Sequence, residues 1–302
     1  MRFLFSLLFF CATTSCFAGE KIEKVFNPVE VRSEILLAKS SPKEMDGLEW
    51  NRWTSKNFIV LSTNNNYANY LNAHLELVKS WCIGRWGLFD VDFTVPCKFI
   101  CVDDPVLFEK MFKLKKTRVE VRRDANGQIK ETVIFLIAND KPSHCVPEPV
   151  TEVCLAEFAQ QYETVLAWWT YRGISILNGS LDQIRKEVAD LSPVIKSNAE
   201  LFFAKGLFET TKKDYDEFSD DDKKLFDECS MCLCLLIRKE LGQNALHSIL
   251  KNNSEPSIKR IGYKSFDDFD KTFKRYMMDL VKDVQSGKTP DSYLQIFEPG
   301  GN

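Results

Sequence analysis

The alternation of apolar and polar residues predicts strands in the first half of the chain. Short apolar runs at residues 57–63 and 97–102 are each closed by polar or turn-forming residues. Between them, apolar residues at spacings of three and four over 67–82 predict a helix. Residues 116–137 predict a hairpin, because apolar and polar positions alternate on both sides of an Asn-Gly turn signal.

The second half of the chain has helical periodicity. A loop over 141–150 leads to a helix expected at 152–166, with Thr151 as its cap. The most apolar helix is expected over 222–241, and its middle is apolar nearly all round, which is typical of a buried helix. An amphipathic helix follows at 265–284. Strands followed by helices indicate an α+β fold.

Residues 1–18 have the three parts of a secretory signal peptide. Arg2 supplies positive charge, an uncharged apolar stretch follows, and small residues precede an expected cut before Gly19. Export to a periplasmic or extracellular compartment is the resulting expectation. A buried first helix and lipidation at Cys16 are the alternatives.

The domain boundaries follow from these patterns. Residues 19–52 form a charged lead-in with little periodicity, and 53–302 form a single domain, strand-rich over 53–140 and helical over 151–290. No later segment reaches 18 uncharged apolar residues, so no transmembrane segment is expected after the signal. With 40 Lys+Arg against 43 Asp+Glu, the chain lacks the basic excess of a nucleic-acid-binding protein.

Eight cysteines follow the expected cleavage site. An even number in an exported chain permits disulfides, but the spacing does not fix any pairing. Several of these cysteines lie in apolar periodic runs, so buried thiols are the other interpretation.

Four stretches stand in an informative order: the strand at 132–137, LAEFAQ at 155–160, WTYRGIS at 169–175, and the apolar helix at 225–241. This order resembles the peptidase MA-like gluzincins, a family of zinc metalloproteases. In that family an edge strand precedes a helix with His-Glu-x-x-His, a second helix opens with Trp-x-x-Glu-Gly, and a long helix packs behind the site. The resemblance, over 53–250, implies a zincin-like fold with a small N-terminal mixed sheet and a mostly helical C-terminal part.

The zinc ligands of that family are missing here. The two histidine positions are Ala156 and Gln160, and the third-ligand position is Arg172; Glu157 alone matches the family's general base. Alanine has no donor atom, a neutral amide is a poor zinc ligand, and a guanidinium repels a dication. The resemblance therefore implies a site without metal or cofactor, in which Glu157 is a vestigial base. We hypothesise that Arg172 pairs with Glu157 where the metal would have been; two unconnected residues are the alternative.

A second set of residues offers different chemistry. His144 and Cys145 precede the helix that begins near Cys154, so a His/Cys/Cys zinc site or a cysteine nucleophile is conceivable there. A disulfide from Cys145 to a distant cysteine, or inert thiols, is the favoured interpretation.

Three functions are compatible with these features. The first is an exported, catalytically inactive binding or scaffold protein, whose partner is a peptide or protein that adds a strand to the edge strand near 134–137. The second is an active hydrolase that uses Glu157 with His144, Cys145 and Cys154. The third is a structural component of an envelope or virus particle.

Overall fold

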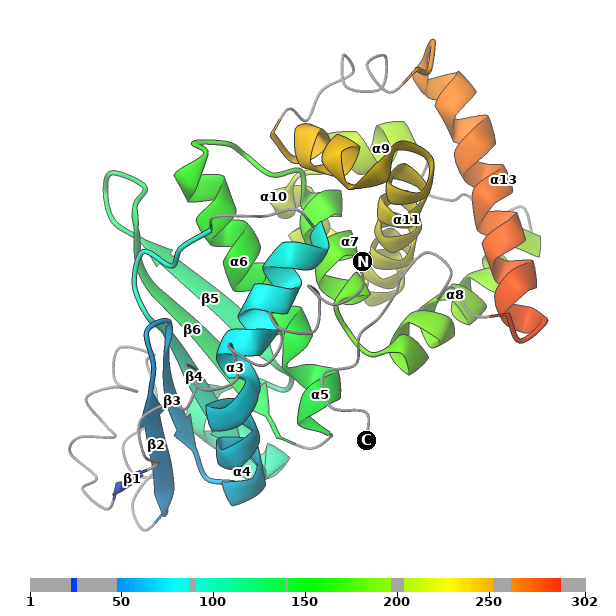
Figure 1. Ribbon diagram of the computed structural model, residues 1–302. Helices are drawn as coiled ribbons and strands as arrows, with labels where there is room; N and C mark the ends of the chain where they lie inside the picture. Colours follow the sequence, from blue (N-terminus) through cyan, green and yellow to red (C-terminus); the bar gives the residue numbers. More distant parts are fainter. Residues whose placement is uncertain are drawn as a thin grey trace, which may run out of the picture. The chain divides into compact units, whose positions relative to one another are not determined.

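A computed structural model describes residues 23–25, 48–86, 91–138, 141–196, 204–251 and 262–288 (Figure 1). The expected signal peptide lies outside these ranges. The chain forms two compact units, one from Met1–Cys82 and Asp92–Glu157 and the other from Ile83–Val91 and Phe158–Asn302. The first unit contains the sheet, whereas the second is helical, and the α+β class is confirmed.

Within the described ranges, six strands form one mixed sheet, in the order β1-β2-β3-β4-β6-β5. Its centre is parallel, because β3 pairs with β4 and β4 with β6 in the same direction. The other neighbours are antiparallel. The strands are β1 (Glu23–Val25), β2 (Trp50–Thr54), β3 (Phe58–Ser62), β4 (Cys97–Val102), β5 (Arg118–Arg123) and β6 (Ile129–Ile137).

The edge strand differs from the expectation. The segment 132–137 belongs to β6, which lies between β4 and β5, so the prediction of an edge near 134–137 is wrong. The residues from Val133 to Leu136 are all buried, as an internal strand requires. The edge is β5, whose residues are half-buried or exposed.

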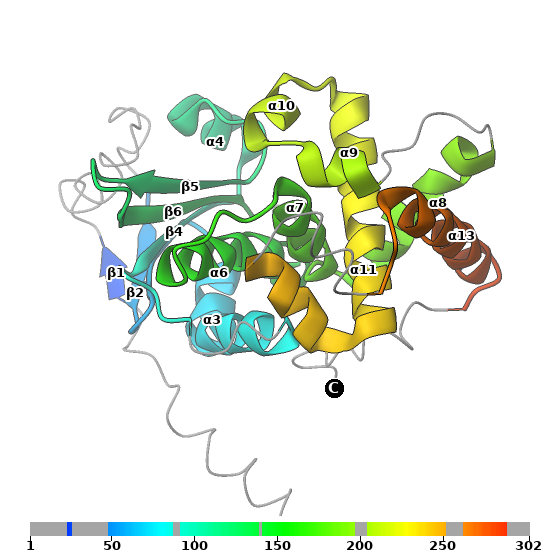
Figure 2. The same ribbon diagram turned by 90° about the horizontal axis from the view of Figure 1, so that it is seen from above.

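The two faces of the sheet are covered differently. On one face, α4 (Pro105–Phe112) packs Phe108 and Met111 against a core that includes Val133 and Phe135 of β6. Helices α3 (Asn65–Trp86) and α6 (Pro147–Gln161) lie on the opposite side of the sheet (Figure 2). The alternation of side chains along each strand therefore directs Cys97 and Phe99 of β4 toward α3 and α6.

Several local predictions need correction. The helix predicted from the spacing over 67–82 is longer at both ends, because α3 spans Asn65–Trp86. The expected loop at 141–150 contains α5 (Pro142–Cys145) and the start of α6, which begins at Pro147. Thr151 is therefore inside α6, where its hydroxyl donates to the Pro147 carbonyl at 2.7 Å, and it is not a cap. The charged lead-in also includes β1 and the start of β2.

The helical unit is organised around α11 (Asp220–Lys251), which packs against α7, α8, α9 and α13. Their bounds, with that of the short α10, are α7 (Trp168–Leu177), α8 (Leu181–Lys196), α9 (Ala204–Glu209), α10 (Lys212–Glu217) and α13 (Phe266–Gln285). A Cβ at Gly173 of α7 would lie 2.5 Å from the Ser230 carbonyl oxygen of α11. Glycine is required there because the two helix backbones approach so closely. Across the described helices, none is both long and apolar enough to span a bilayer.

Candidate functional site

Glu157, the residue that matches the gluzincin base, is buried in the sheet unit. It lies near the end of α6 and is 2% exposed. Its Oε2 accepts two hydrogen bonds from Thr94, from the backbone N–H at 3.1 Å and from the hydroxyl at 2.7 Å. Its Oε1 has no hydrogen-bond partner. Burial is the largest influence on this carboxyl and raises its pKa, while the two bonds from Thr94 oppose the rise.

Lys79 of α3 is a buried cation whose charge lowers the pKa of this carboxyl. Its ammonium donates to the side-chain oxygen of Asn57 at 3.3 Å and lies 4.5 Å from the centre of the Phe93 ring. Burial lowers the pKa of Lys79, and the electrostatic influence of Cys154 and other groups partly offsets this. The amine thus has a hydrogen bond and an aromatic face to stabilise its charged form.

The thiols beside Glu157 are inert at neutral pH. Burial raises the pKa of Cys97 to about 12 and that of Cys154 well above its usual value. A protonated thiol is a poor nucleophile. None of the eight described cysteines forms a disulfide, and seven of them are buried, which fits the interpretation as core thiols.

The residues at the zinc-ligand positions do not fit zinc. Ala156 is buried and carries no donor atom. The guanidinium of Arg172 is committed elsewhere, because its Nε and Nη2 donate to the Asp227 carboxylate of α11 at 3.0 and 2.8 Å. The Tyr215 hydroxyl donates to the same carboxylate at 3.1 Å. At the three ligand positions, Ala156, Gln160 and Arg172 therefore supply none of the anionic or imidazole ligands of a catalytic zinc.

Asp227 and Thr94 are the partners that the sequence did not identify. Arg172 and Asp227 are 55 residues apart, and Thr94 and Glu157 are 63 apart, so no local pattern signals either pair. The pairing of Arg172 with Glu157 joins residues of the two units and stays a hypothesis.

The alternative set of His144, Cys145 and Cys154 is not brought together. The Cys145 sulfur lies 3.0 Å from the Tyr67 hydroxyl and 3.2 Å from the Lys141 carbonyl oxygen. Cys154 is fully buried on α6. Within the described ranges, the one group of three side chains with metal-ligand spacing is a different one, Glu187, Asp190 and Glu228 of the helical unit.

A lysine ammonium already lies among these three carboxyl groups. The ammonium of Lys224 lies 2.6 Å from Asp190 and 3.7 Å from Glu228. Burial, followed by the charge of Glu187, raises the pKa of Glu228 to about 8. Lysine and a retained proton therefore both reduce the repulsion among the three carboxyl groups, and we interpret the group as an interhelical ionic network.

Comparison with known proteins adds no relative: no family model, no curated protein and no solved structure matches the chain.

Proposed function

We propose that this protein is exported, catalytically inactive and gluzincin-like in fold, and that it binds an extended segment of a peptide or protein. The segment would add a strand at the outer edge of β5. The observation that carries the proposal is the place of β5: it ends the sheet, and among the described strands it pairs with β6 alone. A strand in this position presents backbone N–H and C=O groups to which an extended chain can bond.

The order of elements supports the likeness to gluzincins. A strand hairpin precedes α6, which carries Glu157, and α7 begins with two tryptophans and contains Gly173 after the third-ligand position. The long helix α11 packs directly against α7. These are the relations that the resemblance implies, apart from the identity of the edge strand.

The chemistry of Glu157 supports a role without catalysis. A general base must reach a water or substrate, whereas this carboxyl is 2% exposed and anchors Thr94 of the segment before β4. Among the described residues, the one group with metal-ligand spacing, Glu187, Asp190 and Glu228, does not include Glu157, which would need a metal beside it to activate a water molecule as in this family.

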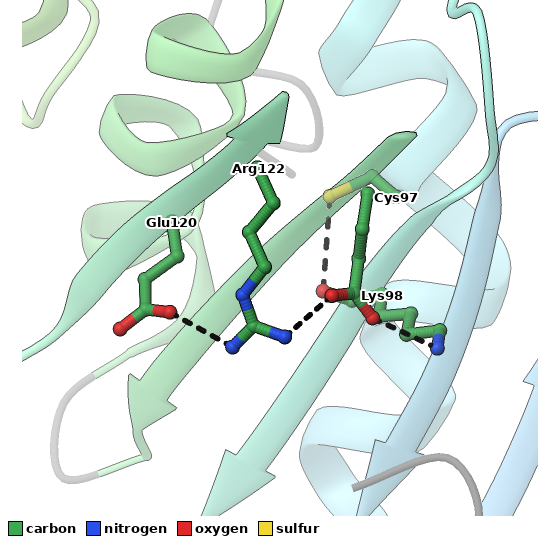
Figure 3. A network of polar contacts seen from close by, with 5 residues as sticks. Cys97, Lys98, Glu120 and Arg122 are labelled. Atoms are coloured by element: carbon green, nitrogen blue, oxygen red, sulfur yellow. Dashed lines mark hydrogen bonds and ion pairs between the residues drawn. The ribbon is translucent and has the colours of Figure 1, made fainter. Parts of the chain in front are cut away.

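An ionic network makes the proposed binding edge rigid. Arg122 of β5 bonds to Glu120 at 3.0 Å and to Glu131 of β6 at 2.6 Å, and Lys98 of β4 bonds to Glu131 at 3.1 Å. Figure 3 shows this chain of alternating charges crossing three strands on one face of the sheet. Because the network joins β5 to the sheet centre, the edge is ordered before a partner arrives, which lowers the entropic cost of binding.

Two adjacent proline substitutions test strand addition. Neighbouring residues of a strand direct their N–H groups to opposite sides, so one of Glu120→Pro and Val121→Pro removes an outward donor and the other removes a donor to β6. The purified variants would be compared with wild type for thermal stability and for binding to an immobilised library of extended peptides.

The proposal expects one variant to keep its melting temperature within a few degrees and to lose peptide binding. The other should be clearly destabilised, because it loses a ladder hydrogen bond. Wild type binding no peptide, or undiminished binding by the variant that remains folded, would contradict strand addition at β5.

A further inference from the structure

Trp86, at the end of α3, is a buried aromatic platform in the helical unit. Its side chain is completely buried, and its indole N–H donates to the side-chain oxygen of Asn178, also fully buried, at 2.8 Å. This bond fixes the ring in one orientation. Two guanidinium groups lie against the ring: the Arg238 carbon is 4.9 Å from its centre and the Arg85 carbon 5.7 Å.

Arg238, on α11, has no neutralising partner among the described residues. Throughout the described chain, no hydrogen bond or ion pair to its guanidinium is found, and its Nη1 is buried without a hydrogen-bond partner. Burial also lowers its pKa, with no carboxylate to oppose the effect. The contact with the Trp86 ring stabilises the cation through a cation–π interaction. Withdrawing a charge from water costs several kcal/mol, so stacking offsets only part of it.

Arg172 shows how the same unit surrounds another mostly buried arginine. It is on the helix that packs against α11, it is also mostly buried, and there the chain supplies a carboxylate in bidentate geometry. At Arg238 the same unit supplies an aromatic ring and a second arginine. Among the described residues, no carboxylate takes at Arg238 the place that Asp227 takes at Arg172, so an anion from outside the chain would supply the missing partner.

We infer that Arg238, stacked on Trp86 and accompanied by Arg85, forms a binding site for an oxyanion, with phosphate as the preferred group. The guanidinium fork matches two oxygens of a carboxylate or phosphate. The positive charge of Arg238 attracts a dianion more strongly than a monoanion, so phosphate is expected to bind more tightly than acetate. This site is in the helical unit and is independent of strand addition at β5.

Calorimetric titration of the purified full chain tests the site. Inorganic phosphate is the probe at pH 7.5, sulfate is the dianion control, and acetate represents a carboxylate at the same ionic strength. Arg238→Met removes the charge but keeps much of the side-chain volume, and Arg238→Lys keeps the charge but removes the fork. Arg275→Met is the matched control, because Arg275 is exposed on α13.

Phosphate should bind wild type and Arg275→Met equally, and Arg238→Met should weaken binding by about tenfold or more, as expected for loss of charge-assisted hydrogen bonds. Arg238→Lys should be intermediate, and it serves as the test if Arg238→Met fails to fold. Without phosphate, Arg238→Met should melt at or above the wild-type temperature, since an unpaired buried charge is removed. No binding at 10 mM phosphate, which corresponds to a binding free energy of roughly 3 kcal/mol or weaker, would overturn the inference. Equal binding by all variants would overturn it too. Tighter binding of acetate than of phosphate would overturn the preference for phosphate.

Discussion

Arg172 and Arg238 are two mostly buried guanidinium groups in the same helical unit, and their surroundings differ in one respect. Arg172 has a bidentate partner in Asp227, whereas Arg238 contacts Trp86 and has no carboxylate among the described residues. The first arrangement is complete within the chain and therefore stabilises the fold. The second is incomplete, and an external anion would complete it. The difference separates a structural charge from a binding charge without reference to any relative.

The largest effect is expected from removing the partner of Arg172. Asp227→Ala leaves a mostly buried guanidinium without its carboxylate and also removes the acceptor of the Tyr215 hydroxyl. We expect the free energy of unfolding to fall by about 2–4 kcal/mol, measured by urea denaturation. Asp216→Ala is the control, since its ion pair with Lys212 is exposed and should contribute less than about 0.5 kcal/mol. Equal losses in the two variants would show that the Arg172 pair is not structural.

Gly173 offers a test of the contact between α7 and α11, the two helices that bear Arg172 and Asp227. Gly173→Ala places a methyl group 2.5 Å from the Ser230 carbonyl oxygen, so α7 must move away from α11. A loss of about 1–3 kcal/mol in unfolding free energy is expected. Gly84→Ala is the matched control in another helix, because nothing lies within 4 Å of the added Cβ. It should raise stability by about 0.5–1 kcal/mol, and a loss as large as that of Gly173→Ala would refute the close-contact argument.

A smaller effect is expected from Glu228, whose neighbours include carboxyl groups of like charge. Its pKa is about 8 in the folded chain and roughly 4.3 when unfolded. Between these values the folded state holds the extra proton, so this group's contribution to stability is present at low pH and is lost as pH rises toward 8. The full shift corresponds to roughly 4 kcal/mol between pH 5 and 8.5, and solvent screening reduces it, so Glu228→Gln should remove a dependence on the order of 1–2 kcal/mol.

Urea unfolding of wild type and Glu228→Gln at several pH values measures this dependence. The stability difference between them should change in favour of the variant as pH rises. Glu217→Gln, at an exposed position, should show no such change. Parallel curves for wild type and Glu228→Gln would mean that Glu228 ionises normally in the folded chain.

The sequence predicted most elements but not their order in the sheet. The strands β3 and β4, the β5–β6 hairpin and the Ser265 start of α13 follow from local patterns, and all are confirmed. The edge was assigned wrongly because pairing order depends on contacts between distant segments. The continuous apolar run in β6 was the available signal, since a strand buried on both faces is typically internal.

The candidate sites depended still more on distant contacts. The alignment with a zinc motif singled out Glu157 and Arg172, but their partners, Thr94 and Asp227, are more than 50 residues away. The arrangement of Arg238 on Trp86 joins α11 to the end of α3, and neither residue belongs to a motif. Composition identifies such residues only as an arginine and a tryptophan, so their burial, and the lack of a carboxylate partner for Arg238 among the described residues, had to come from the fold.

Metal analysis of the purified protein tests the central claim, that this chain binds rather than cleaves, most directly. The account predicts no stoichiometric zinc after purification without chelators, because Ala156, Gln160 and Arg172 supply no suitable ligand set. About one tightly bound zinc per chain that is lost on Cys145→Ala would contradict it, since the alternative set with His144 and Cys154 would then form a metal centre.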